Sequence, residues 1–373
     1  MGILIICDIN SYLVRQLVAE YYREHPDFSI DILDVFRGVL LKGHELAVFP
    51  LQPGPRPGFA KKRAILKGLW RSAVYMLSAR KYDHIHLFYL APAYRLVFRL
   101  IRMKSRALVI TLFGSDFYLI SRFQQKMGGP FLRNARWITF SNEGMAADFI
   151  AVHGALKEKV RVCRFGLSLT PHIERWIGMP EKAKATLGLP AGKIVVCCGH
   201  SASRRERHDL IISQLAGLPG EIKSLLFCVF PFTYNADFAL INEVELAMKT
   251  TGIPFLILAR SLTDDEVAAL RVATDVMISI PSSDQMTASM LETLYAGGHV
   301  ITGQWLPYDL LDRSKVIYSR IPSPGDLGSC LVDLLAGHDR QGFLTPDHHN
   351  RQVIGSLFAW NSTVGDWLDL YRS

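Results

Sequence analysis

Short apolar runs alternate with amphipathic stretches along most of this chain. In the first half, the apolar runs predict strands at residues 3–7, 29–33, 46–50, 84–90, 107–112, 137–141 and 159–163. Most of the stretches between them have a helical period, as at residues 10–24, 60–80, 92–104 and 142–152. Because parallel strands need helical crossovers and lie buried on both faces, the alternation predicts a parallel sheet between two layers of helices.

A second series of the same kind follows a less regular stretch that contains Pro171, Pro180 and Pro190. Its apolar runs predict strands at residues 193–198, 223–230, 254–259, 275–280, 298–302 and 315–319. Helical periods fall at residues 205–216, 235–249, 264–273, 285–297 and 325–337. The third of these helices has a capping-box spacing at its start, with Thr263 as the N-cap and Glu266 three residues later.

The two series predict an α/β protein with two doubly wound, Rossmann-like domains that face a central cleft. We place the first domain at residues 1–165, a linker at 166–191 and the second domain at 192–345. The tail, 346–373, has a helical pattern, and its helix could return to the first domain. Ligands of doubly wound domains bind in the crevice at the carboxyl ends of the strands.

Composition indicates that both domains can be well packed, since 49% of the 373 residues are apolar. No window contains 18 uninterrupted apolar residues, so we predict no transmembrane helix. The first eight residues lack a basic segment and a cleavage site, and they indicate a first strand rather than a signal peptide. The six cysteines form no CxxC pair and are expected to be buried, reduced thiols of a cytosolic protein.

The net charge of +8 is concentrated in one segment. Residues 56–106 contain 13 Lys and Arg side chains and a single acid, Asp83, so the rest of the chain sums to −4. Two predicted helices within 59–106 carry basic residues at helical spacing beside apolar ones, including Trp70. Such helices suit an anionic membrane surface, although core-facing helices with solvated arginines would have the same pattern. No nucleic-acid recognition motif accompanies them, so we expect no nucleic-acid partner.

Residues 275–301 combine several features of a ligand site. A buried strand is followed by a polar turn, and a helix is expected to begin at 283–285. The free N–H groups of a helix start can bind an anion. We therefore name Ser283, Asp284 and Thr287 as candidates for donor binding.

Glu292 lies about two turns into the predicted helix, among apolar residues. A carboxylate in such surroundings needs a partner. A pair of sugar hydroxyls would supply one, and so would an arginine elsewhere in the chain, whereas a solvent-facing glutamate would need none. The pattern alone leaves these alternatives open.

This segment resembles the donor-site motif of GT-B enzymes of glycosyltransferase family 4. Pro281-Ser282 matches the end of the family's strand, and Leu291-Glu292 with the Ala-Gly pair after it matches the later positions. The resemblance implies that Glu292 binds the ribose of a nucleotide and that an acidic residue contacts the donor sugar. The acid at that place is Asp284, one methylene shorter than the family's glutamate, and the usual glycine between the two acids is missing.

Another predicted strand runs into Gly199-His200-Ser201 and an arginine-rich helix start. Backbone amides and a guanidinium at such a turn suit a diphosphate, although a solvated basic helix start would have the same sequence. The segment resembles the corresponding loop of bacterial transferases that add 4-acetamido-4,6-dideoxygalactose to polyprenyl-linked acceptors. That resemblance implies donor contacts from Gly199, Ser201, Arg204 and His208.

Two further segments resemble parts of the same transferases. Tyr234 lies in a Pro-Xaa-Xaa-Tyr turn, for which the resemblance implies a donor contact, and Asp116 lies in a Gly-Xaa-Asp-Xaa-Tyr element. Asp116 is a candidate general base for an acceptor hydroxyl, or it caps a turn. Ser115, together with Asp8 and Asn10 after the first strand, is an acceptor-side candidate. Asp8 or Asn10 would equally serve as a helix N-cap.

Together with the resemblance, these residues predict transfer of a sugar from a nucleotide diphosphate sugar to a lipid-linked or polysaccharide acceptor. The protein would be cytoplasmic and peripheral on the cytosolic face of a membrane. Arg204 would stabilise the departing diphosphate, and Asp116 would be the second catalytic residue. No HExxH, Asp-Xaa-Asp, GxGxxG or GxxxxGK[ST] motif occurs, so we expect no metal and no cofactor besides the donor substrate. Replacing Arg204 or Glu292 by Ala is expected to abolish transfer and leave the fold intact.

Two alternatives of other classes use the same fold. A non-catalytic scaffold would dock on an anionic membrane through 59–106, and the aspartate at position 284 is consistent with it. An enzyme that rearranges nucleotide sugars would need no lipid. Binding to nucleotides separates the scaffold from both enzymes, and binding to vesicles separates the two enzymes from each other.

Overall fold

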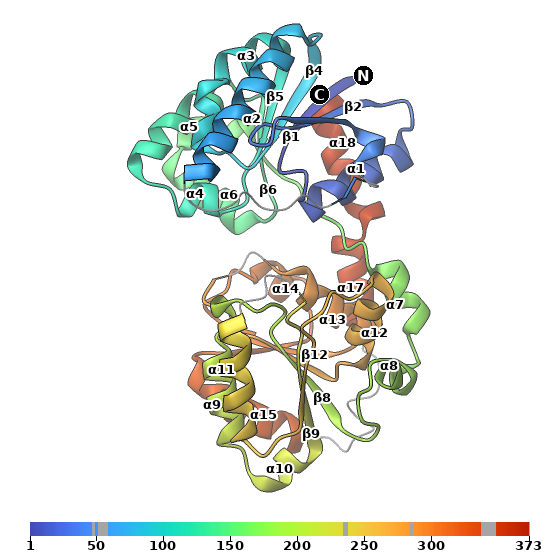
Figure 1. Ribbon diagram of the computed structural model, residues 1–373. Helices are drawn as coiled ribbons and strands as arrows, with labels where there is room; N and C mark the ends of the chain where they lie inside the picture. The colour runs from blue at the N-terminus through green and yellow to red at the C-terminus, as the bar shows by residue number, and fades with distance from the viewer. Residues whose placement is uncertain (47–48, 51–58, 234–237, 284–285, 337–347, 373) are drawn as a thin grey trace. The chain divides into compact units, whose positions relative to one another are not determined.

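The computed structural model describes residues 1–46, 49–50, 59–233, 238–283, 286–336 and 348–372 (Figure 1). The chain divides into two compact units, each with its own sheet. Unit 1 comprises Met1–Gly166 and Trp360–Ser373, and unit 2 comprises Leu167–Ala359. The prediction of two Rossmann-like α/β domains is confirmed.

Unit 1 contains a seven-stranded sheet of order β3-β2-β1-β4-β5-β6-β7. Its strands are β1 (Gly2–Ile6), β2 (Ser29–Asp34), β3 (Val39–Lys42), β4 (Tyr82–Phe88), β5 (Ser105–Thr111), β6 (Trp137–Phe140) and β7 (Val160–Val162). Neighbouring strands are parallel, except that β3 is antiparallel to β2. The order reverses between β1 and β4, because the chain winds outward to β3 and then resumes on the other side of β1.

The predicted strand at 46–50 is wrong for the residues that the structure describes there. The edge strand is β3, and Leu46 follows a short 3-10 helix, η1 (Gly43–Glu45). In β3, Leu41 is buried and Leu40 is exposed. Alternation over only four residues, as in β3, is a weak strand signal. The apolar run at 46–50 is stronger, so the sequence pattern favoured the wrong segment.

Helices cover both faces of the unit 1 sheet (Figure 1). They are α1 (Tyr12–Glu24), α2 (Phe59–Ser78), α3 (Phe98–Lys104), α4 (Ser115–Tyr118), α5 (Arg122–Asn134), α6 (Glu143–Val152) and α18 (Trp360–Arg372), with the 3-10 helices η2 (Pro92–Leu96) and η3 (Gly154–Lys159). α2, α3, α5 and α6 pack on one face, and α1 and α18 pack on the other. The central strands are therefore buried on both faces, which explains their unbroken apolar runs.

Unit 2 contains a six-stranded, parallel sheet of order β10-β9-β8-β11-β12-β13. Its strands are β8 (Ile194–Cys198), β9 (Leu226–Phe230), β10 (Phe255–Ile257), β11 (Val276–Ser279), β12 (His299–Gly303) and β13 (Ser319–Ile321). The order reverses between β8 and β11. The last strand begins later than the predicted 315–319, because Lys315 has a φ of 58°, which a strand cannot include.

The helices of unit 2 also form two layers. They are α7 (Thr170–Trp176), α8 (Pro180–Thr186), η4 (Arg204–Glu206), α9 (His208–Ala216), α10 (Gly220–Leu225), α11 (Phe238–Lys249), α12 (Asp264–Ala273), α13 (Ala288–Ala296), α14 (Asp309–Arg313), η5 (Pro324–Asp326), α15 (Leu327–Ala336) and α17 (His348–Phe358). α9, α11 and α15 pack on one face, and α8, α12, α13 and α17 pack on the other. The capping box at the start of α12 is confirmed, since Thr263 and Glu266 exchange side chain to backbone hydrogen bonds.

The boundary between the units differs from the predicted linker at 166–191. The chain from Leu167 to Ala359 belongs to unit 2, where α7 and α8 pack against α12. Lys184 of α8 is buried and pairs with Asp275, just before β11 (Nζ–Oδ2 3.0 Å). This segment looked irregular because its helices are short and begin beside prolines.

The predicted tail helix is divided into α17, which belongs to unit 2, and α18, which belongs to unit 1. The return of the C-terminal helix to the first domain is thereby confirmed. Trp367 of α18 is fully buried, and its indole Nε1 donates to the carbonyl of Arg164 (2.7 Å). The Tyr371 hydroxyl lies 2.6 Å from Nδ1 of the buried His86 of β4. The last helix therefore completes the core of the first unit.

The six cysteines are free, and five of them are buried. Burial raises the pKa of the Cys7 and Cys163 thiols, so both are poor nucleophiles. These observations fit the predicted reduced thiols. Within the described part of the chain, the structure has no helix that is both long and apolar enough to cross a bilayer.

Candidate functional site

Each sheet has one place where the strand order reverses, and open α/β sheets bind ligands on the loops that leave the strands there. In unit 2 the loops after β8 and β11 meet at this place. The amide of Gly199 donates to the carbonyl of Ile278, and that of Ser282 donates to the carbonyl of Arg205, both at 2.9 Å. In unit 1 the loops after β1 and β4 hold the equivalent position.

The loop after β8 turns at Gly199, whose φ of 70° lies in the left-handed region. A Cβ atom here would lie 3.0 Å from Oε2 of Glu206 and 3.0 Å from Nε2 of His208. Glycine alone fits without displacing these buried groups. The Ser201 hydroxyl donates to Oε1 of Glu206 (3.2 Å). The structure thus brings together three predicted donor-side residues, Gly199, Ser201 and His208.

Glu206 lies at the centre of this cluster and was not among the predicted site residues. It is 3% exposed, and its Oε1 is 3.0 Å from Nδ1 of His200. Among the described residues, its buried Oε2 has no hydrogen-bond partner. A buried oxygen of this kind calls for a donor from a ligand or water. In the sequence, Glu206 is the single acidic residue in a run of arginines. That opposite charge was the one feature that could have indicated a special role.

His208 begins α9 and is 1% exposed. Burial lowers its pKa to about 4, so its ring is neutral at pH 7. It packs edge-on against Phe232, with ring centroids 4.9 Å apart. A neutral ring can hydrogen-bond a ligand, but positive charge for a diphosphate has to come from arginines. Tyr234 lies outside the described residues, so its donor contact stays a prediction.

Arg204 forms a two-pronged ion pair with Glu243 of α11. Its Nη1 is 3.0 Å from Oε2, and its Nη2 is 2.8 Å from Oε1. Both side chains are exposed, and exposed pairs contribute only about 0–1 kcal/mol. A diphosphate could therefore displace Glu243, and diphosphate binding by Arg204 stays a prediction.

Arg207 is a second guanidinium beside these loops. It lies over the indole of Trp305, 5.4 Å from the ring centroid. Trp305 follows β12, and its Nε1 donates to the carbonyl of Pro281 after β11 (2.9 Å). This cation–π contact positions a positive charge next to the loops after β8, β11 and β12.

The helix after β11 begins later than predicted. α13 starts at Ala288, with Thr287 as its N-cap. Met286 has a φ of 73°, so the chain makes a left-handed turn that a right-handed helix cannot include. Ser283 is exposed in the preceding loop, and Asp284 lies outside the described residues. Donor contacts from Ser283, Asp284 and Thr287 stay predictions.

Glu292 is 6% exposed, and its Oε2 is 3.0 Å from Nε of Arg271 of α12. The sequence left open whether Glu292 pairs with sugar hydroxyls, with an arginine or with solvent. In the structure its partner is the arginine Arg271. Burial raises the pKa of Glu292, and Arg271 opposes that shift. His200 also lowers this pKa, so Glu292 shares its electrostatic surroundings with Glu206. Ribose binding by Glu292 stays a prediction.

Asp116 is buried at the start of α4, and both of its oxygens accept backbone N–H groups. Oδ2 accepts from Leu90 (2.8 Å), and Oδ1 accepts from Phe113 (2.9 Å) and Gly114 (3.1 Å). Burial raises its pKa, and these hydrogen bonds act in the opposite direction. These contacts join the loops after β4 and β5, and Asp116 caps neither helix, since the N-caps of α4 and α5 are Gly114 and Ser121. A role as a base stays a prediction, as does an acceptor contact from the exposed Ser115.

Asp8 follows β1 and belongs to a charged cluster. Nη1 of Arg37 donates to Oδ1 of Asp8 (2.9 Å) and to Oδ2 of the buried Asp34 (2.6 Å). The amide of Asn10 also donates to Oδ1 of Asp8 (2.9 Å). The N-cap of α1 is Ser11, so the capping alternative for Asp8 and Asn10 is wrong.

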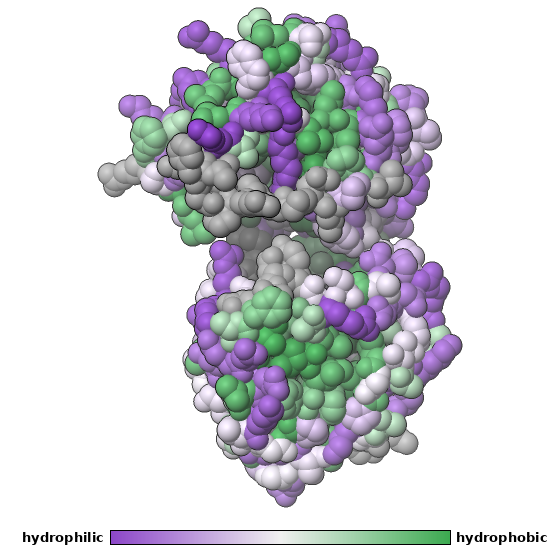
Figure 2. All heavy atoms as spheres, viewed as in Figure 1, coloured by the Kyte–Doolittle hydropathy of each residue, from purple (hydrophilic) through white to green (hydrophobic). Residues whose placement is uncertain are grey.

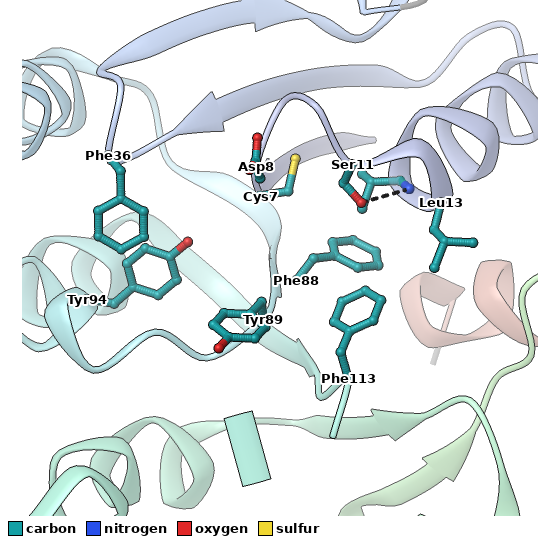
Figure 3. Close-up of a pocket in the computed structure, with 10 residues that line it drawn as sticks. Cys7, Asp8, Ser11, Leu13, Phe36, Phe88, Tyr89, Tyr94 and Phe113 are labelled. Atoms are coloured by element: carbon teal, nitrogen blue, oxygen red, sulfur yellow. Dashed lines mark hydrogen bonds between the residues drawn. The ribbon is translucent and has the colours of Figure 1, made fainter. Parts of the chain in front are cut away.

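A cavity of about 470 Å³ lies beside Asp8, at the reversal point of unit 1 (Figure 3). Its lining comes from the loops after β1, β2, β4 and β5 and from the start of α1. Half of the ten lining residues are aromatic, namely Phe36, Phe88, Tyr89, Tyr94 and Phe113. Sequence reasoning placed Asp8 on the acceptor side but missed the cavity, because these rings are far apart in the chain.

No protein-family model matches the sequence, and no curated protein matches it. Solved structures match it over almost its whole length. HepE from Anabaena, in complex with UDP-glucose, is 15% identical, with a TM-score of 0.69 over 99% of both chains. Sucrose-phosphate synthase from Thermosynechococcus elongatus is 15% identical, with a TM-score of 0.70 over 100% of this chain and 98% of that chain. WaaG, a glycosyltransferase involved in lipopolysaccharide biosynthesis, is 13% identical, with a TM-score of 0.66 over 99% of both chains.

The chain has the GT-B fold. Four described non-glycine residues of this GT-B chain have left-handed conformations, and one of them, Lys315, precedes β13; the other three lie elsewhere. Tyr89 (φ 71°) follows β4, Arg207 (57°) precedes α9, and Met286 (73°) precedes α13. Such conformations cost on the order of 1–3 kcal/mol each and cluster at ligand sites. All three lie on loops at the reversal points, which supports these loops as the candidate sites of both GT-B units.

α2 exposes apolar and basic side chains on one surface, which we call the α2 face. Its members are Leu66, Trp70, Val74 and Leu77, together with Arg63, Lys67 and Arg71. The opposite side of α2 packs Leu69 and Met76 into the core. Figure 2 shows hydrophobic and hydrophilic side chains interleaved on the visible face of unit 1. α3 buries Ile101, and α2 buries one side while exposing apolar residues on the other, so membrane docking through these helices stays a prediction.

Among the residues that the structure describes, no group of three or more His, Cys, Asp or Glu side chains is arranged to hold a metal ion. Metal independence and the lack of a cofactor stay predictions for this GT-B chain.

Proposed function

We propose that this GT-B protein is a glycosyltransferase that moves a sugar from a nucleotide diphosphate sugar to a lipid-linked or polysaccharide acceptor. The observation that carries the proposal is the cluster around Gly199, at the reversal point of the unit 2 sheet. There the buried Oε2 of Glu206 lacks a hydrogen-bond partner among the described residues, and a ligand hydroxyl would supply one. HepE shares the fold and was solved with UDP-glucose, which supports a nucleotide sugar as the donor.

Two arginines supply the charge that the departing diphosphate needs. Arg204 exchanges its exposed partner Glu243 for phosphate oxygens, and Arg207 is oriented by Trp305. Fixed cations stabilise the negative charge that develops on the leaving group. The resemblance to family 4 assigns the ribose to Glu292, which Arg271 keeps oriented.

The α2 face supports an acceptor at a membrane. A basic side chain near an anionic bilayer contributes about 1 kcal/mol. Exposed apolar residues such as Trp70 favour insertion at the interface. The protein therefore acts peripherally, on the cytosolic face of the membrane.

A nucleotide panel tests the donor assignment. We expect one of UDP, GDP, TDP or CMP to raise the unfolding temperature, since saturation at 100 times Kd adds about 2.7 kcal/mol. Arg204→Ala and Arg207→Ala should each reduce that shift, measured by differential scanning fluorimetry. Arg205→Ala is the matched control, because Arg205 is an exposed neighbour in η4 and should leave the shift unchanged.

The non-catalytic scaffold is the second candidate, favoured by the engagement of both Asp116 oxygens with the backbone. It predicts that no nucleotide stabilises the protein. A nucleotide-sugar-rearranging enzyme predicts stabilisation by a nucleotide together with no binding to lipid vesicles.

A further inference from the structure

The cavity beside Asp8 has walls made of aromatic pairs. Phe36 and Tyr94 stack with centroids 5.2 Å apart and an interplanar angle of 13°. Phe88 and Phe113 form a second pair, tilted by 44° at 6.3 Å. In Figure 3 the Phe88 and Phe113 rings lie next to each other, apart from the Phe36 and Tyr94 pair. A ligand in this cavity therefore meets ring faces and edges on more than one side.

Such walls select against a hydroxyl-rich body. Each ligand hydroxyl that leaves water needs a new partner, because an unpaired polar group is costly to bury. Apolar surface predominates in this lining, whose polar side chains are those of Asp8, Ser11, Tyr89, Tyr94 and the weakly hydrogen-bonding Cys7. An apolar ring or chain has no such requirement, and its burial is favourable.

One carboxylate is available beside these rings. Both side-chain hydrogen bonds of Asp8 described above, from Arg37 and from Asn10, go to Oδ1. They fix the orientation of the group while Oδ2 can accept a hydrogen bond from a ligand. Arg37 is in turn fixed by the buried Asp34. The site therefore offers an oriented acceptor for one hydroxyl.

Tyr89 projects from a strained position into the same lining. Its φ is 71°, which bulky residues rarely adopt. Its amide donates to the carbonyl of Thr111 of β5 (3.0 Å), which fixes the backbone there. Its ring is 41% exposed, so burial of the ring in the core does not explain the strain. A residue kept in such a conformation beside a cavity is a candidate ligand contact.

We propose that this cavity binds the hydrophobic part of the acceptor, an alcohol whose reacting hydroxyl is carried on an aromatic or alkyl body and hydrogen-bonds to Asp8. The inference rests on the proposed function: it favours the lipid-linked class over the polysaccharide class and places the hydrophobic group next to the reacting hydroxyl. Tyr89 is then a specificity-determining residue, since its ring covers the bound group. A glycan without a hydrophobic group does not enter this cavity.

The test uses 2-naphthalenemethanol as the probe and methyl glucoside as its hydroxyl-rich counterpart. Binding to the full-length protein is measured by saturation-transfer NMR and titration. The naphthyl alcohol binds the wild type, and methyl glucoside does not compete with it. Tyr89→Gly weakens binding by about three- to tenfold, the range expected for one lost aromatic contact. Its unfolding temperature does not fall, because glycine adopts a φ of 71° without strain.

Lys315→Gly is the matched control, because Lys315 also has a positive φ (58°) but belongs to unit 2 and is not among the residues that line this cavity. It retains wild-type affinity for the naphthyl alcohol. Equal binding by the wild type and Tyr89→Gly, or displacement of the probe by methyl glucoside, overturns the proposal. Nucleotide binding without alcohol binding overturns this inference alone and leaves the proposed function standing. Alcohol binding without any nucleotide binding overturns the proposed function and, with it, the acceptor role of the cavity.

Discussion

Glu292 and Arg271 are both more than nine-tenths buried, and each is the other's partner. The cost of taking two charges out of water is offset by their attraction and their hydrogen bond. Removing one of them leaves the other charge buried and uncompensated. The expectation that Glu292→Ala would leave the fold intact therefore conflicts with the environment of this residue.

We expect Glu292→Ala to lower the free energy of unfolding of unit 2 by roughly 3–5 kcal/mol, because Arg271 is left as an unpaired buried cation. Urea unfolding, followed by hydrogen exchange in peptides of α12 and α13, measures this. A loss under about 1 kcal/mol, the range of an exposed pair, would contradict the buried ion pair.

The double variant Arg271→Met with Glu292→Met is the matched control. Replacing both charges by apolar groups should restore most of the stability. It then tests the predicted ribose contact separately from stability, since a folded protein without the carboxylate should bind the nucleotide more weakly. Wild-type nucleotide affinity in the double variant would remove Glu292 from the donor site.

The sequence predicted single residues well where local backbone geometry decides their role. Gly199 was identified from its motif, and the structure explains it by the two buried groups that a Cβ would meet. Glu206 and Arg271 were missed, because their burial comes from residues distant in the chain. A charged residue is exposed or buried according to its packing, which a linear pattern does not contain.

At the scale of elements, α2 has two apolar sides instead of one. A surface helix normally buries its apolar stripe and presents polar residues outward. α2 does bury one stripe, but it also exposes apolar residues on the α2 face, and Trp70 is 69% exposed. An exposed apolar patch among basic residues suits the interface of an anionic bilayer.

We expect the protein to float with vesicles of phosphatidylcholine and phosphatidylserine and to bind pure phosphatidylcholine less well. Trp70→Ser with Leu77→Ser should reduce binding, because the variant inserts less apolar surface, and added salt should reduce it by screening the basic residues. Vesicle flotation across a salt series measures both effects.

Leu246→Ser of α11 provides the control, because Leu246 is 66% exposed on a helix of unit 2. It should not change flotation. A similar loss with Leu246→Ser, or equal binding to neutral and anionic vesicles, would contradict docking through the α2 face.

At the scale of the whole molecule, the chain passes from unit 1 to unit 2 and then back through α18. Trp367 packs with Phe88 and Phe165 of unit 1, at centroid distances of 6.0 and 4.8 Å. The fold of the first unit is therefore completed by residues at the end of the chain. Integrity of unit 1 should depend on a helix that follows all of unit 2.

We expect Trp367→Ala to destabilise unit 1 by about 3–5 kcal/mol, the usual cost of truncating a buried tryptophan. Hydrogen exchange should accelerate in β1 and β4 and remain unchanged in β8 and β11. Mass spectrometry of peptides from each unit measures this difference.

Phe358→Ala is the matched control, since Phe358 is buried at the end of α17 and belongs to unit 2. It should accelerate exchange in unit 2 and spare unit 1. If Trp367→Ala accelerated exchange in both units equally, the assignment of α18 to unit 1 would be contradicted.

By itself, the sequence determined the class of fold, most strands and helices, and the loops on which the candidate ligand residues lie. These features follow from backbone periodicity and local capping, as at Thr263, where the relevant interactions join residues close together in the chain. The division of the C-terminal helical pattern, the late start of α13 and the place of β3 depended on turns and pairings that the local pattern does not fix.

Tertiary structure alone decided which charges are buried and with which partners, as for Glu206 and Glu292. It also assembled the aromatic cavity beside Asp8 from four separate loops and the start of α1. The physical reason is the same in each case. Burial and cavities are properties of surfaces brought together by folding, and the residues that form them share no local pattern in the sequence.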